Sequence, residues 1–170
     1  MPDTLDDKSL YDTISNRLAT ILRARGMRLA TAESCTGGWI AKACTDIPGS
    51  SAWFSAGLVT YSNEAKQTVL GIDASLLSEH GAVSYQVVAQ MLDHTLGKVT
   101  DADIAVAVSG IAGPDGGCAA KPVGTIWLGW QLRGGTPRIR HFNFVGSRSD
   151  IRRTTVAHAV QGIVQLLQEG

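Results

Sequence analysis

The sequence predicts an α/β fold of three layers (α/β/α), with a mixed, mostly parallel sheet of about five strands between two layers of helices. Three observations lead to this fold class. Segments with apolar residues at helical spacing alternate with short apolar segments that are typical of strands. The length of 170 residues suits one domain, 1–170, with no linker or repeat inside it. Two late strand segments are joined by a glycine-rich turn, which favours an antiparallel pair and makes the sheet mixed.

The first third of the chain predicts a covering helix followed by a β-α-β unit. Apolar residues at helical spacing, followed by Gly26, predict a helix over residues 9–25. Residues 28–33 are short and extended in character, and residues 37–44 have a helical pattern. Residues 51–61 are rich in aromatic and β-forming residues, so they predict the next strand.

The middle of the chain predicts two capped helices and the central strand. Asn63 is a suitable cap for a helix through residue 70, and Ser84 caps a longer helix whose apolar residues share one face. Residues 104–108 form an uninterrupted apolar run with polar residues and glycine on either side. This pattern is typical of a strand buried on both faces, so we expect it at the centre of the sheet.

The last third of the chain predicts two strands and a closing helix. Residues 124–132 and 138–144 have strand character and are connected through Gly134 and Gly135, so they are expected to pair antiparallel. The final helix begins near Ser149.

Composition excludes several classes of function. Fifteen basic and fifteen acidic residues balance, so no nucleic-acid partner is expected. No apolar stretch reaches the roughly 20 residues of a membrane helix, and residues 1–8 lack a signal peptide pattern, so we expect a cytoplasmic protein. The cysteines, Cys35, Cys44 and Cys118, are odd in number and lack metal-ligand spacing, so they predict reduced thiols and no metal site.

The junction between the first strand and the helix after it offers a candidate nucleophile, Ser34. Ligands of α/β proteins gather at the carboxyl ends of strands. Backbone N–H groups near Thr36, Gly37 and Gly38, at the start of the helix, could stabilise the oxyanion formed when Ser34 attacks a carbonyl. The two glycines would also allow a substrate to approach closely. The alternative is that Ser34 or Thr36 only caps the helix.

Cys35 is the rival nucleophile, because a thiol at a helix N-terminus has a lowered pKa. No histidine lies near it in the sequence, so it ranks after Ser34. A Ser-His-Asp triad lacks support as well, since none of the histidines lies in a glycine-rich loop after a predicted strand: His80, His94, His141 and His158.

Tyr61 and Lys66 follow a strand and enter a helix, where both could face Ser34. With Asn63 as the cap, Lys66 falls in the first turn and can point back over the strand end. A lysine can deprotonate a serine if burial lowers its pKa, and a tyrosine hydroxyl can relay the proton. Taken singly, a solvated helix lysine and an edge-strand aromatic are the simpler interpretations.

The loop after the central strand has the composition of a binding loop. Ser109, Gly110 and Gly113 belong to a segment whose glycines expose N–H groups to a phosphate or carboxylate, although a tight turn needs glycines as much. No P-loop or Rossmann pattern follows a strand, so ATP and NAD are not expected and no cofactor is predicted.

A positive region lies near the end of the chain. Residues 133–153 hold six arginines and a single acid, which suits a phosphate-bearing ligand. Arg148, just ahead of the last helix, is best placed to bind it, whereas Arg152 and Arg153 are expected only to solvate a helix face.

The chain resembles the CinA carboxy-terminal domain family over nearly its whole length. Six segments carry the resemblance: 32–38 (AESCTGG), 48–54 (PGSSAWF), 59–66 (VTYSNEAK), 81–84 (GAVS), 109–114 (SGIAGP) and 121–125 (KPVGT). The resemblance implies a nicotinamide-nucleotide amidase, which converts nicotinamide mononucleotide and water to nicotinate mononucleotide and ammonia. It also implies a catalytic serine, tyrosine and lysine, which match Ser34, Tyr61 and Lys66.

Several expectations follow from the resemblance. Longer relatives carry an additional amino-terminal domain, so a stand-alone amidase is expected here. The loop after Ser109 and the region of Arg148 would hold the ribose phosphate. The family often has Gly-Asp-Arg where this chain has Ser147 before Arg148, and Tyr85 and residues 118–120 are also unusual for the family, so these positions bear on substrate preference. A non-catalytic nucleotide-binding module and an amidase for another amide stay open, as does the choice between a monomer and a homodimer.

Overall fold

Five strands form one sheet in the computed structural model, which describes residues 7–169 of the chain. In sheet order they are β2 (Phe54–Val59), β1 (Leu29–Glu33), β3 (Ile104–Gly110), β4 (Thr125–Leu132) and β5 (Arg138–Asn143). β1 pairs parallel with β2 and β3, whereas β3–β4 and β4–β5 are antiparallel. Four strands therefore point the same way and only β4 runs against them, which confirms the mixed, mostly parallel sheet with the 104–108 strand at its centre.

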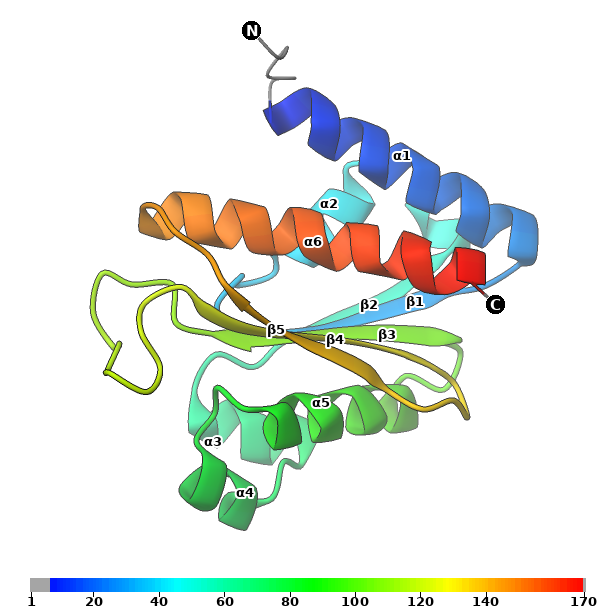
Figure 1. The fold of residues 1–170 in the computed structure, drawn as a ribbon. Helices are drawn as coiled ribbons and strands as arrows, with labels where there is room; N and C mark the ends of the chain where they lie inside the picture. Colours follow the sequence, from blue (N-terminus) through cyan, green and yellow to red (C-terminus); the bar gives the residue numbers. More distant parts are fainter. Residues whose placement is uncertain (1–6, 170) are drawn as a thin grey trace, which may run out of the picture.

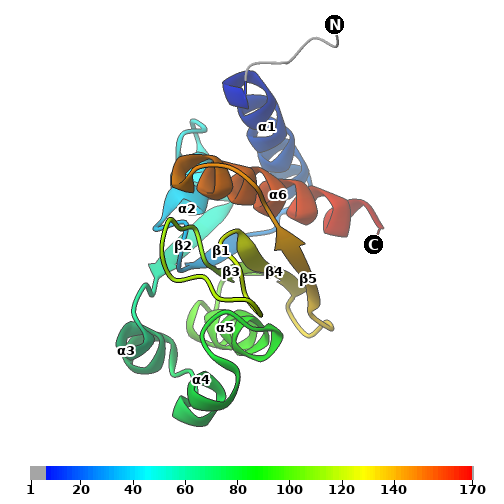
Figure 2. The ribbon, with the colours of Figure 1, turned by 60° about the vertical axis from the view of Figure 1, so that its left-hand side comes forward.

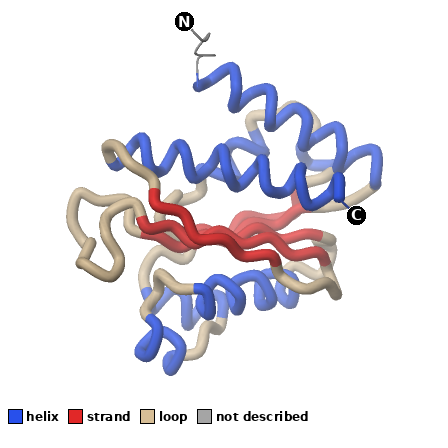
Figure 3. Tube along the Cα trace, viewed as in Figure 1, coloured by secondary structure: helices blue, strands red, loops and turns tan. Residues whose placement is uncertain are grey.

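Helices cover both faces of the sheet, so the predicted three layers are confirmed (Figures 1 and 3). One layer consists of α1 (Asp7–Arg25), α2 (Trp39–Thr45) and α6 (Arg148–Glu169). The opposite layer consists of α3 (Asn63–Ala65), the π-helical η2 (Lys66–Leu70), α4 (Ala74–His80) and α5 (Tyr85–Lys98), and a 3₁₀ turn, η1 (Ser50–Ala52), precedes β2. The rotated view in Figure 2 shows the same separation of the two layers.

Each face of the sheet carries its own hydrophobic core. On the α1 and α6 side, β3 contributes Ile104, Val106 and Val108 to a large apolar cluster. On the α5 side the sheet presents small residues, including Ala105 and Ala107. A Cβ at Gly129 would lie 2.7 Å from Leu92 of α5, so the glycine lets this helix lie close to the sheet. The close fit fixes the N-terminal end of α5 beside the carboxyl ends of the strands.

The helix after Tyr61 begins one residue earlier than predicted. Ser62, not Asn63, is the cap, and its Oγ accepts the N–H of Ala65 at 3.0 Å. The helix continues as the π-helix from Lys66, a form that often occurs at functional sites. The helix α4 was not predicted, because seven residues with only Leu77 buried give too weak an apolar period.

Two expectations concern a signal peptide and a membrane-spanning helix. Most of residues 1–8, which carry the expectation of no signal peptide, lie outside the described residues. Within residues 7–169, no helix has both the length and the apolar character required to cross a lipid bilayer.

Candidate active site

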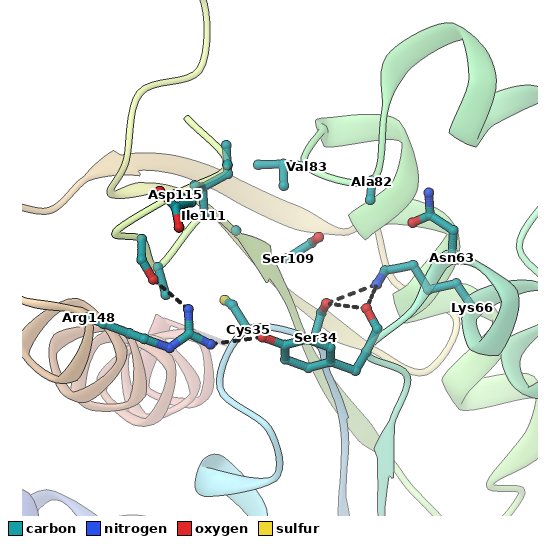
Figure 4. A pocket seen from close by; sticks show the side chains of 15 residues that line it. Ser34, Cys35, Asn63, Lys66, Ala82, Val83, Ser109, Ile111, Asp115 and Arg148 are labelled. Carbon is teal, nitrogen blue, oxygen red and sulfur yellow. Dashed lines mark hydrogen bonds between the residues drawn. The ribbon is translucent and has the colours of Figure 1, made fainter. Parts of the chain in front are cut away.

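A pocket of about 260 Å³ opens at the carboxyl ends of β1 and β3 (Figure 4). Segments that are far apart in the sequence meet there: the end of β1, the start of α3, the loop after β3 and the first turn of α6. Seven of the ten predicted site residues line it: Ser34, Tyr61, Lys66, Ser109, Gly110, Gly113 and Arg148. The prediction that these strand ends form one site agrees with this arrangement.

A buried lysine holds the candidate nucleophile. The Nζ of Lys66 donates to the Oγ of Ser34 at 2.9 Å and to the backbone oxygens of Thr60 and Tyr61 at 2.8 and 3.2 Å. Lys66 is 1% exposed and Ser34 is 7% exposed. Burial lowers the pKa of Lys66 to about 8, because the charged amine loses its hydration. Lys66 is therefore not a solvated helix lysine, and an appreciable fraction of it is neutral near pH 7 to 8.

Tyr61 takes part in the site differently from the prediction. Its backbone oxygen accepts from Lys66, and the Oγ of Ser34 lies 3.5 Å from the same oxygen. Its hydroxyl, on a ring that is 57% exposed in total, accepts a hydrogen bond from Arg148 at 2.9 Å. The expected relay of a proton through the phenol is not arranged here, because the hydroxyl contacts Arg148 rather than Ser34 or Lys66.

Of the oxyanion donors expected at Thr36, Gly37 and Gly38, the N–H groups of the two glycines are already paired. The N–H of Gly37 donates to the Ser34 carbonyl, and the N–H of Gly38 donates to the carboxylate of Glu33. These three residues line a different hollow, on the α2 and α6 side. They make the turn after Ser34 possible, since both glycines have a positive φ, of 61° and 93°.

Glu33 occupies the N–H groups at the start of α2, including that of Gly38. Its fully buried carboxylate accepts the N–H groups of Gly38, Ile40 and Ala41 at 2.8 to 3.1 Å, and the hydroxyl of Thr36 at 2.6 Å. The carboxylate thus takes the place that a ligand anion would occupy at the start of α2. Thr36 is not a cap for α2, because its hydroxyl donates a hydrogen bond to the Glu33 carboxylate instead.

Cys35 lacks the features of a reactive thiol. Burial raises the pKa of Cys35 to about 12, so the prediction of a lowered pKa is wrong. Its backbone has a different property. Within the described part of the chain, the N–H groups of Cys35 and Thr36, the two residues after Ser34, are not donated to another residue. The backbone and the pocket-lining side chain of Cys35 thus lie beside Ser34, the candidate nucleophile.

The opposite end of the pocket is formed by Arg148 and the loop after β3. Arg148 donates to the carbonyl of Gly113 at 2.6 Å and to the Tyr61 hydroxyl, so its guanidinium lies over the pocket (Figure 4). The loop is fixed on its far side by Lys121, whose Nζ donates to the carbonyl of His80 at 2.7 Å. Ser109, at the end of β3, is buried beneath this region.

Three residues that line the pocket were not predicted to belong to the site: Asn63, which was expected only as a cap, Ala82 and Val83. Ile111, Ala112, Asp115 and Gly116 also line it and belong to the loop after β3 that was predicted as a binding loop. The shift of the cap to Ser62 accounts for Asn63, which becomes the first helical residue instead of the cap. Ala82 and Val83 lie between two helices and carry no chemical signal, so only the fold brings them to the site.

Two further expectations bear on the surroundings of the pocket. Arg152 does not merely solvate a helix face, because it donates to the backbone of Cys35 and Thr36. Arg153 is exposed and pairs with Asp150 at 2.6 Å. Within residues 7–169, no group of three His, Cys, Asp or Glu side chains is placed to hold a metal ion.

Comparison with known proteins gives the family. A model of the CinA C-terminal domain matches residues 11–167. The nicotinamide-nucleotide amidohydrolase PncC of Escherichia coli (strain K12) is 50% identical over 152 residues, or 89% of this chain and 92% of that protein. PncC of Pseudomonas putida is 49% identical over 91% of this chain and 95% of its own length. The crystal structure of the competence/damage inducible protein CihA from Agrobacterium tumefaciens has a TM-score of 0.90 at 40% identity, covering 98% of this chain and 99% of that one. The chain therefore belongs to the CinA C-terminal domain family.

Proposed function

We propose that this chain is a nicotinamide-nucleotide amidohydrolase, which converts nicotinamide mononucleotide and water to nicotinate mononucleotide and ammonia. One observation carries the proposal: the amine of Lys66, buried and lowered in pKa, lies 2.9 Å from the Oγ of Ser34 inside a pocket whose rim holds Arg148. Relatives that are 50% and 49% identical over most of this chain are named for the same reaction.

The first half of the reaction transfers the acyl group to the enzyme. Neutral Lys66 takes the proton of Ser34, and the serine oxygen attacks the carboxamide carbon. The N–H of Cys35 stabilises the negative oxygen of the tetrahedral intermediate, as the N–H of the residue after the nucleophile does in other serine hydrolases. Lys66 then returns its proton to the amide nitrogen, the C–N bond breaks, and ammonia leaves.

The second half releases the product. Lys66, neutral again, takes a proton from water, whose oxygen attacks the ester carbon. The ester bond to Ser34 breaks, and Lys66 returns the proton to the serine oxygen. Nicotinate mononucleotide leaves with both oxygens on its carboxyl carbon, so the amide has been exchanged for an acid without a cofactor.

The nucleotide is held at the other end of the pocket. The guanidinium of Arg148 offers a charged, forked donor to the phosphate, and the glycines after Ser109 leave room for the ribose phosphate. Ser109, Gly110 and Gly113 line this part of the pocket. Free nicotinamide lacks the phosphate and would leave Arg148 without a substrate contact.

The decisive experiment is ammonia release from nicotinamide mononucleotide by the wild type and by Ser34→Ala, with free nicotinamide as a second substrate. We expect turnover of the nucleotide by the wild type and its loss in Ser34→Ala. Turnover that survives in Ser34→Ala would refute Ser34 as the nucleophile. A wild type that binds the nucleotide stoichiometrically but releases no ammonia would refute the amidase and support a binding module.

A further inference from the structure

Arg152 contacts the backbone just after the nucleophile from the side opposite the pocket. Its Nε donates to the carbonyl of Cys35 at 3.0 Å, and its NH2 donates to the carbonyl of Thr36 at 3.1 Å. The guanidinium carbon also lies 5.3 Å from the centre of the Trp39 ring, a cation–π distance. Two consecutive carbonyls and the first residue of α2 are thus bound by one planar side chain.

Glu33 holds the same turn from the other end. Its carboxylate occupies the N–H groups at the start of α2, while Arg152 occupies the carbonyls that precede them. The turn of residues 34–38 is therefore fixed by one anion and one cation, each paired with backbone groups of matching polarity. Ser34 leaves β1 at the start of this turn, so the turn determines where its Oγ lies.

We propose that Arg152 is a positioning residue, which holds the turn after Ser34 so that the serine Oγ meets the amine of Lys66. Arg152 contributes nothing to the lining of the pocket; it lies in the separate hollow with Trp39 and the glycines of the turn. It acts through the backbone and makes no contact with substrate. The proposal rests on the proposed function only for the choice of substrate in the assay below.

Arg152 lies on the same helix, α6, as the pocket residue Arg148. Arg148 lies one turn earlier on the same helix and reaches the pocket rim. The docking of α6 thus fixes two points of the site at once, the substrate end through Arg148 and the nucleophile turn through Arg152. Removing the Arg152 contacts frees the turn while leaving the Arg148 contacts in place, which allows the two roles to be separated.

The test compares Arg152→Lys and Arg152→Met with matched changes of the neighbouring exposed residue, Arg153→Lys and Arg153→Met. Three quantities are measured below the melting temperature of every variant: kcat and KM for nicotinamide mononucleotide, the labelling rate of Ser34 by a fluorophosphonate detected by mass spectrometry, and the Kd of the nucleotide in a Ser34→Ala background. The labelling rate reports the reactivity of Ser34 whether or not the nucleotide is the substrate.

We expect Arg152→Met to lower both kcat and the labelling rate by roughly 10- to 100-fold, since a misplacement of about 1 Å costs about that much. KM and Kd should change less than about threefold, because substrate contacts are untouched. The kcat and labelling rate of Arg152→Lys should lie between those of the wild type and Arg152→Met, because an ammonium lacks the forked guanidinium that spans two carbonyls. The Arg153 variants should match the wild type.

Unchanged kcat and labelling in the Arg152 variants would overturn the proposal. So would a raised Kd with normal labelling, which would make Arg152 a substrate contact, or unfolding of both variants, which would make its role structural. A wild type that is labelled but releases no ammonia would refute the proposed function alone. A wild type that is not labelled would refute the activated serine and the positioning role together.

Discussion

The two ends of the pocket differ sharply in their exposure to water. At the Ser34 end, Ser34 and Lys66 are buried, and among the described residues the lysine amine donates to Ser34 and to backbone oxygens alone. At the Arg148 end, the guanidinium contacts a tyrosine that is more than half exposed. A base of lowered pKa needs a dry site, whereas a charged nucleotide needs an open one. The pocket satisfies both demands by separating them in space.

The strongest test of the buried end is removal of its amine. Lys66→Met replaces the base by an apolar chain of similar length, and we expect kcat to fall about 1,000-fold, the usual contribution of a positioned base. KM should stay close to the wild-type value because Arg148 is unaffected. Ammonia release under saturating and limiting substrate separates the two constants.

The melting temperature provides the control for Lys66→Met. Removing an amine whose burial disfavours its charged form should leave the fold at least as stable as the wild type. A variant that melts normally and retains more than a tenth of the wild-type kcat would refute Lys66 as the base.

The pH dependence of turnover tests the same end without mutation. Only neutral Lys66 can accept the serine proton, so kcat should rise about tenfold per pH unit below about 8 and level off above it. A solvated lysine would instead place the midpoint near 10.5. Measuring kcat rather than kcat/KM matters, because the free substrate phosphate also titrates, near pH 6. A kcat that is flat from pH 6 to 9 would exclude Lys66 as the titrating base.

The open end is tested by Arg148→Ala. Loss of a charge-assisted contact to the phosphate should raise KM for nicotinamide mononucleotide roughly 10- to 100-fold, with a much smaller change in kcat. The rate with free nicotinamide should not change. Arg140→Ala, which removes an exposed arginine of β5 outside the pocket, is the matched control. If Arg148→Ala lowered kcat as much as Lys66→Met does, the two ends would not be separable.

The sequence predicted the elements of the fold well because their signals are local. The apolar run of β3 and the helical spacing of α1, α5 and α6 each appear within one segment. The sequence also predicted that Ser34, Tyr61 and Lys66 lie together at one edge of the sheet, because the carboxyl ends of neighbouring parallel strands lie side by side. The short α4 was missed because its apolar residues do not recur at a clear helical spacing.

What the sequence did not predict depends on packing between distant segments. The N–H groups of the turn after Ser34 were expected to bind an oxyanion, but the buried Glu33 carboxylate occupies that of Gly38. Arg152 was expected only to solvate a helix face, and the docking of α6 shows that it reaches the turn after Ser34. The pKa of Cys35 was misjudged because proximity to a helix N-terminus was weighed without burial.

The smallest effect is expected at Cys35, which lies beside Ser34 in the pocket. Cys35→Ala keeps the backbone N–H, so turnover should remain within about threefold of the wild type. Cys44→Ala is the matched control, since Cys44 is also a buried thiol but lies in the core away from the pocket. Both variants lose sulfur packing and should lower the melting temperature by similar, small amounts.

Opposite outcomes in the two cysteine variants would reverse the assignment of the nucleophile. If Cys35→Ala abolished turnover while Cys44→Ala did not, and Ser34→Ala remained active, the thiol would be the attacking group despite its raised pKa. The dry end of the pocket argues against this. Burial raises the pKa of the Cys35 thiol more than the nearby cations Lys66 and Arg152 lower it, so the proton stays on sulfur. In the proposed mechanism, Ser34 instead passes its proton directly to the adjacent Lys66 amine. The same desolvation that inactivates the thiol therefore activates the serine through its neighbour.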